Sequence, residues 1–449
     1  MPLSRVNFQK VQKLNSGMVK HLKESIKSYM SKFKYDLGII GLGYVGLPLA
    51  VYSVDAGLKV FGYDINSEKV SKLNQGISPI EDVSDKTLNL SIDSGLIFSD
   101  ESKSLRDCEH IVISVPTPLT DFKPDLSYVI SAAQEIAKNV VEGQIIILES
   151  TTYPGTTLEV LIPEIQKISD LKPGEDIFFG YSPERIDPGN KEWNFKNTPK
   201  VVSGINDDSL SKIKSFYEKI IDTVVVVSGT KEAEMVKLLE NTYRQVNIAL
   251  INELAIMCNM LEIDIWEVVE AAKTKPFGFE SFRPGPGVGG HCIPIDPKYL
   301  SFKTRQIGKP VRFVELAQEI NNSMPAYVVN RIIERMNVLE KPMKNSKILI
   351  FGVAYKKDIS DTRESPALDI IANFKSKGVE ISFYDPFVDS LIVDNKEVNK
   401  EISQENFEEY DMLLMHTPHS EFSSINFSKI NVPIFDATGS EFIDDAERI

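Results

Sequence analysis

The stretch Asp36-Leu-Gly-Ile-Ile-Gly-Leu-Gly-Tyr-Val-Gly-Leu-Pro-Leu-Ala50 decides the fold of this chain. It begins as a short apolar strand, turns at Gly41, Gly43 and Gly46, which form a G-x-G-x-x-G pattern, and continues as a predicted helix over 47–56. In this strand–turn–helix setting the glycines allow a tight turn, let the backbone approach a pyrophosphate and let the helix pack closely on the strand. The pattern predicts a dinucleotide-binding α/β domain; a glycine-rich turn in another kind of α/β protein is the alternative.

The residues after the turn provide candidates for holding the cofactor. Residues 59–64 predict a second strand ending in Asp64, whose carboxylate can accept hydrogen bonds from ribose hydroxyls and repels a 2′-phosphate, which favours NAD over NADP. Strands predicted over 111–118 and 144–152 end in polar residues, and ligands of a parallel sheet lie beyond the carboxyl ends of its strands. The predicted cofactor contacts are Gly41, Gly43, Tyr44, Val45, Gly46, Asp64, Thr117 and Thr151.

A carboxylate and a guanidinium are further candidates on the same edge of the predicted sheet. Glu149 ends one of these strands, and an acid in a surface loop is the alternative reading. Strands over 176–181 and 223–228 complete the strand inventory predicted for this domain. The turn-rich loop 182–190 between them brings Arg185 near the cofactor edge.

Length, charge and cysteine usage narrow the class of protein. The 449 residues exceed what one hydrophobic core organises, so two or three domains are expected. A formal net charge of -14 argues against nucleic acid or an anionic membrane surface as a partner. Three widely spaced cysteines fit a reducing cytoplasm and exclude a zinc cluster built from cysteine alone, and no metal site is predicted. Without a run of about 18 apolar residues or a signal-peptide core, a cytoplasmic protein with no stable membrane insertion is expected.

The middle of the chain predicts helices. Residues 231–272 read as one long helix, because an apolar stripe recurs at helical spacing without glycine or proline. A second long helix is predicted over about 311–336, with Pro325 as its one expected kink. Lys237 and Asn241 are four residues apart and project from one face of the first helix, although such a pair is usually solvated surface. Two long helices between α/β units predict a spacer domain and a homodimer interface.

A loop rich in glycine and proline, Arg283-Pro-Gly-Pro-Gly-Val-Gly-Gly-His-Cys-Ile-Pro-Ile-Asp-Pro297, surrounds a single cysteine. Glycine lets the backbone approach a ligand and proline stiffens the loop, so the segment suits a pocket that holds an anionic ligand on main-chain N–H groups. Cys292 lies near its end, with His291 before it and Asp296 four residues later. A structural loop with an incidental buried cysteine is the alternative.

An α/β pattern returns near residue 347. A helix is predicted over 365–377, and strands are predicted over 347–354, 379–385, 412–417 and 432–436. Gly352 stands alone in the first turn, so this second unit is not expected to bind a dinucleotide. Its loop instead carries Lys356, Lys357 and Arg363, which suit phosphate groups; a solvated run of charges is the alternative.

The predicted architecture is of the α/β class, with two Rossmann-like doubly wound domains joined by a central all-helical domain. A basic amphipathic extension over 1–35 precedes them and is expected to dock on the acidic body of the protein rather than on a membrane surface. The predicted domains are an NAD-binding domain over 36–228, a helical dimerisation domain with the cysteine loop over 229–338, and a second Rossmann-like domain over 339–449.

This combination predicts an oxidoreductase with covalent catalysis. Oxidation of an alcohol to an aldehyde needs no cysteine, but a thiolate becomes useful when the aldehyde is oxidised further. A thiohemiacetal can donate a second hydride and leave a thioester that water hydrolyses. Lys237 could stabilise an oxyanion and Asn241 orient it. Asp296 or Glu149 could position or deprotonate water.

Seven short motifs occur along the chain in this order: Gly41-Leu-Gly-Tyr-Val-Gly-Leu-Pro, Val115-Pro-Thr-Pro, Glu149-Ser-Thr, Ser182-Pro-Glu-Arg, Lys237-Leu-Leu-Glu-Asn241, Gly289-Gly-His-Cys-Ile-Pro-Ile-Asp296 and Asp361-Thr-Arg-Glu-Ser-Pro. Together they resemble the UDP-sugar 6-dehydrogenase, or nucleotide-sugar dehydrogenase, family over essentially everything after residue 35. The resemblance implies NAD-dependent four-electron oxidation of a sugar C6 alcohol to a carboxylate. It also implies a UDP-sugar-binding C-terminal domain, a homodimer formed by the central helices and a place in polysaccharide precursor synthesis.

The resemblance also implies roles for individual residues. Cys292 would be the nucleophile, with Lys237 and Asn241 as stabilisers of oxyanionic intermediates. Asp296 and Glu149 would serve water and proton transfer. The substrate contacts that the resemblance and the loop positions together predict are Arg185, Arg283, Gly289, His291, Lys356 and Arg363.

Two segments narrow the substrate. The loop 182–190 and Cys292-Ile-Pro-Ile-Asp-Pro resemble the branch of the family that acts on UDP-N-acetylhexosamines, with UDP-N-acetylglucosamine favoured. The chain departs from the UDP-glucose branch at Leu119, where that branch commonly has a threonine that helps to hold catalytic water. The alternatives are the same reaction on UDP-glucose or UDP-N-acetylmannosamine, a two-electron hydroxyacid-type dehydrogenase with Lys237 as base and a structural Cys292, and a non-catalytic nucleotide-sugar-binding protein.

Overall fold

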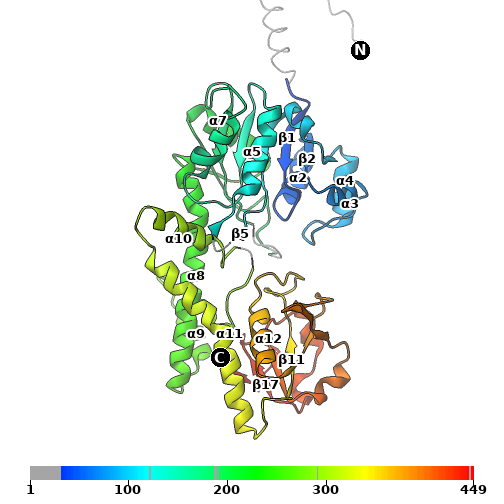
Figure 1. Cartoon of the computed structure of the whole chain (residues 1–449), viewed down its shortest axis with the longest axis vertical. Coiled ribbons are helices and arrows are strands. Elements are labelled where there is room, and N and C mark those ends of the chain that lie inside the picture. The colour runs from blue at the N-terminus through cyan, green and yellow to red at the C-terminus, as the bar shows by residue number, and fades with distance from the viewer. Residues whose placement is uncertain (1–31, 121–122, 187–189, 191, 291, 444–445) are drawn as a thin grey trace, which may run out of the picture.

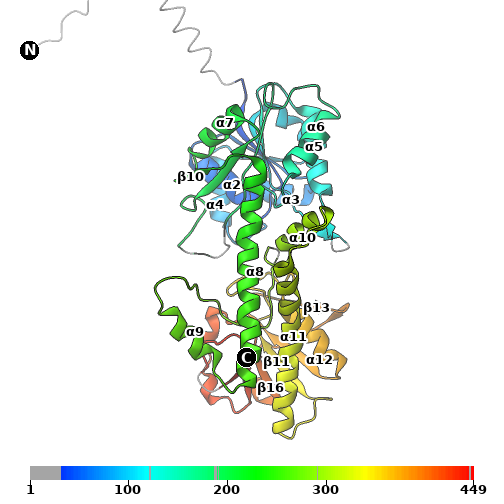
Figure 2. The same ribbon diagram turned by 90° about the vertical axis from the view of Figure 1, so that its left-hand side faces the viewer.

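The computed structural model describes residues 32–449 except 121–122, 187–189, 191, 291 and 444–445. Two α/β domains lie at opposite ends of an elongated molecule, and long helices run between them along one side (Figure 1, Figure 2). The helix predicted for the basic N-terminal extension falls outside the described residues. None of the described helices has an apolar stretch that would span a bilayer.

The N-terminal domain is built on an eight-stranded sheet with the order β10-β9-β8-β7-β4-β1-β2-β3. All neighbouring strands are parallel except β8 and β9. Uninterrupted apolar runs, such as the isoleucines of β7, suit strands that are covered on both faces. The strands are β1 (Tyr35–Ile40), β2 (Val60–Tyr63), β3 (Ile97–Ser99), β4 (Cys108–Ile113), β7 (Ile145–Leu148), β8 (Phe178–Tyr181), β9 (Lys200–Gly204) and β10 (Val224–Val226).

Helices cover both faces of this sheet. One hydrophobic core includes side chains of α2 (Gly46–Asp55), α3 (Ser67–Asn74), α4 (Asp85–Asp93) and α7 (Asp207–Tyr217). The other includes α5 (Ser127–Asn139) and α6 (Ile162–Gln166) together with the beginnings of three central helices. The domain is therefore doubly wound, as the sequence predicts.

The predicted strand inventory of this domain was wrong in one respect that matters for the site. Strand β9 lies between β8 and β10 and runs antiparallel to β8, with Gly180 opposite Gly204. It is a short run of five residues, and its first residue is a buried lysine, Lys200, which hides the apolar pattern by which strands are recognised.

The central region consists of α8 (Thr230–Met260), α9 (Ile265–Lys273), α10 (Asp296–Gln306) and α11 (Arg312–Val338), the last with Pro325 inside it. The prediction of one helix over 231–272 was wrong, because α8 ends at Met260. Glu262 adopts a left-handed φ of 58°, and the Asp264 carboxylate then accepts the N–H of Trp266 at 2.8 Å to begin α9. The break thus uses an acidic residue at positive φ and an acidic cap rather than glycine or proline.

Helix α8 belongs to the cores of both α/β domains. Near its start Ala233 and Leu238 pack with the N-terminal sheet, whereas Ala255 near its end packs with the C-terminal sheet. A buried glutamate, Glu234, also fixes the start: its carboxylate accepts the N–H of Gly155 at 2.5 Å and that of Thr157 at 2.8 Å. Figure 2 shows the helix running between the two domains.

The C-terminal domain has a six-stranded parallel sheet with the order β15-β12-β11-β16-β17-β18. Helix α12 (Pro366–Ser376) and the central helices pack on one face, and irregular segments cover the other. The fold class is confirmed: two parallel-sheet α/β domains with a helical region between them. The strands are β11 (Lys347–Phe351), β12 (Glu380–Tyr384), β15 (Asn399–Lys400), β16 (Met412–Met415), β17 (Ile434–Asp436) and β18 (Glu447–Arg448).

Candidate active site

The three glycines of the first turn serve two different purposes. Gly41 has φ 95°, and a Cβ there would lie 2.7 Å from the carbonyl oxygen of Ser114; a Cβ on Gly46 would lie 1.9 Å from that of Gly41. These two glycines therefore allow the turn and the helix to pack. A Cβ on Gly43 would meet nothing within 4 Å, so this glycine leaves open space in front of α2. That space fits a dinucleotide pyrophosphate at a helix N-terminus.

Asp64, the predicted contact of the adenosine ribose, lies beside the glycine turn. It follows β2 and is buried, and its Oδ2 accepts the N–H of Leu42 at 2.9 Å, which ties the acid to the glycine turn. The ammonium of Lys69 lies 2.8 Å from the same oxygen. Sequence reasoning missed Lys69; the only signal was its place five residues after the acid, one turn into α3.

The remaining predicted cofactor contacts lie on the same edge. Val45 is the residue before α2, and Tyr44 stands next to it in the turn. Thr151 follows β7 and is partly buried. The carbonyl oxygen of Thr117 accepts the hydroxyl of Tyr299 at 2.8 Å, so this edge is tied to helix α10.

Lys237 and Asn241 do not lie on a solvated face of α8. The Asn241 side chain is buried and donates from Nδ2 to Oδ2 of Asp296 at 2.5 Å. The ammonium of Lys237 donates to the carbonyl oxygen of Glu184 at 2.7 Å. The helix therefore presents an ammonium and an amide to Asp296, which comes from the cysteine loop.

Cys292 lies four residues before the first residue of helix α10, Asp296, and its carbonyl oxygen accepts the N–H of Asp296 at 2.8 Å. Burial raises the pKa of the Cys292 thiol to about 11 and the carboxylate of Asp296 adds to the rise, while positive charge from Lys237, Arg244 and Arg363 partly offsets it. The thiol is thus within the electrostatic reach of Lys237, as the predicted chemistry requires. It is protonated at neutral pH and needs a proton acceptor before it can attack.

Asp296 is suited to be that acceptor. Burial raises the pKa of its carboxyl to about 6, and Lys237 and the hydrogen bond from Asn241 limit the rise. The carboxylate is therefore largely ionised at pH 7 yet close enough to neutrality to take up and release protons.

Glu149 has other partners. It is buried, and its Oε1 lies 2.9 Å from the ammonium of Lys200 and also accepts the hydroxyl of Tyr217. Lys200 in turn lies 2.9 Å from Oε2 of Glu184. The carboxyl is therefore enclosed among charged and aromatic side chains, and its role at a substrate water stays a prediction.

The glycines of the cysteine loop allow it to lie against the C-terminal domain. A Cβ on Gly289 would lie 2.7 Å from Cβ of Tyr355, and Gly290 donates its N–H to the carbonyl oxygen of Arg363 at 3.2 Å. On the other side, the Asn252 amide oxygen on α8 accepts the N–H of Gly285 at 2.9 Å. The loop that carries Cys292 is therefore held between α8 and the C-terminal domain.

The predicted substrate contacts divide into two groups. Gly289 lies against Tyr355 and Glu364, which are the sequence neighbours of Lys356 and Arg363. The Arg363 guanidinium lies 5.6 Å from the Tyr44 ring centroid and 2.5 Å from Asp361. Arg363 thus faces the cofactor turn. Arg185 instead pairs with Glu240 at 2.7 Å. The half-exposed Arg283 pairs with Glu270 at 3.1 Å on α9, and His291 lies outside the described residues.

The two α/β domains meet beside the cofactor turn. Besides the Arg363–Tyr44 contact, the hydroxyl of Ser360 donates to the carboxylate of Glu81. A hollow of about 330 Å³ lies at this junction and is lined in part by Tyr44, Glu81 and Ser360. Residues between 78 and 85 of the N-terminal domain and the loop after β11 therefore line one hollow beside Tyr44 of the cofactor turn.

The C-terminal domain repeats the fold without a dinucleotide site. Gly352 corresponds to Gly41: each follows the first strand of its sheet at positive φ, and a Cβ on Gly352 would lie 2.1 Å from the carbonyl oxygen of Thr417. At the position of Gly43, however, the C-terminal domain has the buried Ala354 instead of a glycine that faces open space. Asp385 holds the place of Asp64 after the second strand, but its Oδ2 accepts the N–H of Val353 at 2.7 Å and lies 3.1 Å from Nε2 of the buried His419. This carboxylate is sealed from a ribose.

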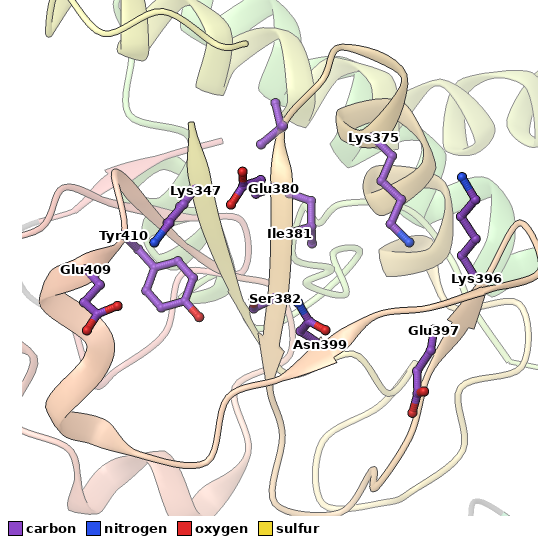
Figure 3. A pocket seen from close by; sticks show the side chains of 11 residues that line it. Lys347, Lys375, Glu380, Ile381, Ser382, Lys396, Glu397, Asn399, Glu409 and Tyr410 are labelled. Atoms are coloured by element: carbon purple, nitrogen blue, oxygen red, sulfur yellow. The ribbon is translucent and has the colours of Figure 1, made fainter. Parts of the chain in front are cut away.

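A second hollow, of about 450 Å³, lies apart from this site (Figure 3). Lys347 and Glu380 begin β11 and β12, so the hollow is at the amino edge of the C-terminal sheet, opposite to the edge that faces the cysteine loop. Its lining includes three lysines and three glutamates, so neither sign of charge predominates and no ligand chemistry follows. In the part of the chain that the structure describes, no group of three or more His, Cys, Asp or Glu side chains could hold a metal ion.

A dinucleotide turn, a ribose-binding acid and a cysteine with an ammonium, an amide and a carboxylate around it define a dinucleotide-dependent oxidoreductase. Three models of the UDP-glucose/GDP-mannose dehydrogenase family match the chain in order: the NAD binding domain over 35–221, the central domain over 231–323 and the UDP binding domain over 349–444. The chain belongs to this family of nucleotide-sugar dehydrogenases and uses NAD.

Known relatives agree in sequence and in structure. A UDP-N-acetyl-D-glucosamine 6-dehydrogenase of Pseudomonas aeruginosa is 37% identical over 398 residues, which are 88% of this chain and 93% of the relative. A UDP-N-acetyl-D-mannosamine dehydrogenase of Methanococcus vannielii is 34% identical over 421 residues, 92% of this chain and 91% of the relative. The solved structure of a UDP-D-ManNAc dehydrogenase from Pyrococcus horikoshii matches with a TM-score of 0.83 at 31% identity, covering 92% of this chain and 96% of that chain.

The raised pKa of Asp296 predicts the acid side of the pH profile. A proton acceptor works only when ionised, so kcat for NADH formation should fall by about tenfold per pH unit below the Asp296 pKa of about 6. Asp296→Asn should lower activity and abolish this dependence. Asp93→Asn, at an exposed acid on α4, should keep the wild-type profile. A wild-type kcat that stays constant down to pH 4.5 would contradict the assignment.

Proposed function

We propose that the chain oxidises the C6 alcohol of a UDP-N-acetylhexosamine, with UDP-N-acetylglucosamine favoured, to the uronic acid through a thioester on Cys292. The observation that carries this proposal is the arrangement of Lys237, Asn241 and Asp296 near Cys292. Asn241 is hydrogen-bonded to Asp296, and the charge of Lys237 acts on both Asp296 and the thiol. An oxidation that stopped at the aldehyde would have no use for the thiol.

The residues of the chain supply the groups for each step. The glycine turn and Asp64 would hold NAD, and two NAD molecules bound in succession would supply the hydride acceptors for the two oxidations. After the first, the Cys292 sulfur bonds to the aldehyde carbon while its proton passes to Asp296. Loss of the second hydride from this thiohemiacetal leaves the thioester, and water then releases the acid and the thiol. In sum, one alcohol and one water give one carboxylate, two transferred hydrides and three protons.

Lys237 and Asn241 are proposed to stabilise the negative charge that develops on the sugar oxygen in both addition steps. A preorganised ammonium and amide do this most effectively in a site from which water is excluded. Asn241 is buried and its amide is oriented by Asp296, so it is already fixed before substrate arrives. Lys356 and the main-chain N–H groups of the glycine loop are proposed to hold the diphosphate.

The identity of the sugar rests on the similarity to UDP-N-acetylhexosamine enzymes. Both the N-acetylglucosamine and the N-acetylmannosamine relatives align over nearly the whole chain, at 37% and 34% identity. Cys292-Ile-Pro favours the first, since the second branch usually has alanine two residues after the cysteine. UDP-N-acetylmannosamine is therefore the second candidate.

A panel of UDP-sugars tests the proposed function. With NAD present, UDP-N-acetylglucosamine should give the highest kcat/KM for NADH formation, and the product should be a uronic acid by mass spectrometry. A higher kcat/KM with UDP-N-acetylmannosamine would overturn the sugar assignment alone. NADH formation with none of the UDP-sugars would overturn the proposed function.

Cys292→Ser tests the covalent step. The hydroxyl is a far weaker nucleophile at neutral pH, so we expect both ligands to bind within about threefold of wild type while acid formation is lost by about 10³-fold or more. Cys258→Ser, at a partly buried free cysteine on α8, is the matched control and should retain activity. Undiminished steady-state acid formation by Cys292→Ser would refute the thioester.

We further propose a homodimer through α8. Leu239, Tyr243, Leu250 and Met257 are all about half exposed, and at 100° per residue they fall within about 40° of one another on the helix. Such an apolar stripe on a helix is typical of a surface that another chain covers. Cytoplasmic localisation is proposed with it, since NAD and UDP-sugars are the ligands.

The proposed dimer is tested by Leu250→Arg. A buried charge at the centre of the stripe should dissociate the dimer, so sedimentation velocity should show a dimeric wild type and a monomeric variant. Leu90→Arg, at an equally exposed leucine on α4, is the matched control and should remain dimeric. A monomeric wild type at micromolar concentration would contradict the proposal.

A further inference from the structure

A buried group of charged and aromatic side chains includes Glu184, to which Lys237 is hydrogen-bonded. The proposed reaction assigns no role to this group. The group consists of Lys200 at the start of β9, Glu149 after β7, Glu184 after β8 and Tyr217 at the end of α7, and each is at most 9% exposed. The ammonium of Lys200 lies 2.9 Å from Glu149 and 2.9 Å from Glu184. The rings of Tyr217 and Phe195 lie 5.5 and 5.7 Å from it.

Glu184 connects this group to Lys237. One carboxylate oxygen of Glu184 accepts Lys200, and the other accepts the N–H groups of Arg185 and Ile186 at 2.7 and 2.8 Å. The carbonyl oxygen of the same glutamate accepts the ammonium of Lys237 at 2.7 Å. Lys200 thereby fixes the backbone to which Lys237 is bound.

The two carboxyl groups around Lys200 are not equivalent. Both oxygens of Glu184 have donors, whereas Oε2 of Glu149 is buried with no hydrogen-bond partner. Two carboxylates against one ammonium would also leave an excess negative charge in a buried place, which is costly. Burial raises the pKa of Glu149, while at Glu184 the effect of burial is outweighed by Lys200 and the backbone N–H groups, which lower its pKa. Glu184 is therefore the better stabilised carboxylate of the two, and Glu149 is the one whose pKa is raised.

We infer that Lys200 is a positioning residue for the reaction: it holds Glu184, and through the Glu184 carbonyl the ammonium of Lys237, while Glu149 acts on Lys200 and not on the substrate. This inference rests on the proposed function. It replaces the water-activating role predicted for Glu149 by a supporting one. A merely structural role of the cluster would predict lower stability without a selective effect on Lys237.

A double-mutant cycle distinguishes these roles. In the full-length enzyme Lys200→Met should lower kcat by about 10²-fold, the effect of misplacing a catalytic group by about 1 Å, with KM for NAD within about threefold. Lys200→Arg should restore most of the loss. In a Lys237→Ala background, Lys200→Met should cost less than about threefold more, because the group it positions is already gone. Equal losses in both backgrounds, or no loss in the wild-type background, would overturn the inference.

Glu149→Gln tests whether the carboxyl supports Lys200 or activates water. The amide oxygen of a glutamine can still accept from Lys200 and Tyr217, so kcat should fall less than tenfold. Loss of a group that activates water should instead cost about 10²–10⁴-fold and let the acyl-enzyme accumulate. If Lys200→Met alone does not fold, Lys200→Met combined with Glu184→Gln removes the buried carboxylate that the loss of Lys200 leaves unpaired. The combined variant should fold and show the kinetic loss of the single one; wild-type kcat in it would overturn the inference.

Hydrogen exchange provides a readout that does not depend on turnover. The amides of 182–186 should exchange faster in Lys200→Met and in the combined variant, but not in Glu149→Gln. Unchanged exchange in all variants would overturn the inference. Failure of the proposed function would appear separately, as absence of NADH from the wild-type enzyme with every UDP-sugar.

Discussion

Helix α8 is buried in two hydrophobic cores at once, and this constraint determines where the chemistry can take place. Its 31 residues span about 46 Å, enough to join the N-terminal core at Ala233 and Leu238 to the C-terminal core at Ala255. Lys237 and Asn241 lie near the first of these anchors. A rigid element that is fixed at both ends places its side chains accurately, which loops do less well.

Burial sets the protonation of the two titratable groups of the site, Cys292 and Asp296. Burial keeps the Cys292 thiol protonated and raises the pKa of Asp296 to about 6. The thiol therefore needs a nearby base, and the Asp296 carboxylate can take up its proton. The ammonium of Lys237 lowers both pKa values and is itself held by a main-chain carbonyl. Behind it, the Lys200–Glu184 pair keeps that carbonyl in place, so each charged group of the site is held by a neighbour that is itself fixed.

Features of the fold and the site that depend on local sequence patterns could be predicted, whereas features that depend on contacts between distant residues could not. The glycine turn and Asp64 lie within one strand–helix–strand unit, so their relation is visible in the chain. The end of α8 depends on a left-handed Glu262 and an Asp264 cap, which a search for glycine and proline overlooks. The pairing of Glu149 with Lys200 joins residues 51 positions apart across strands whose order the sequence does not show, and it was missed together with β9.

The central claim is that one site carries out both oxidations. The number of NADH molecules formed per UDP-sugar consumed, with NAD in excess and the UDP-sugar limiting, tests it most directly. Two NADH and one uronic acid for each sugar is the result that a thioester route predicts. One NADH for each sugar, with the aldehyde released into solution, would contradict it and leave Cys292 without a chemical role.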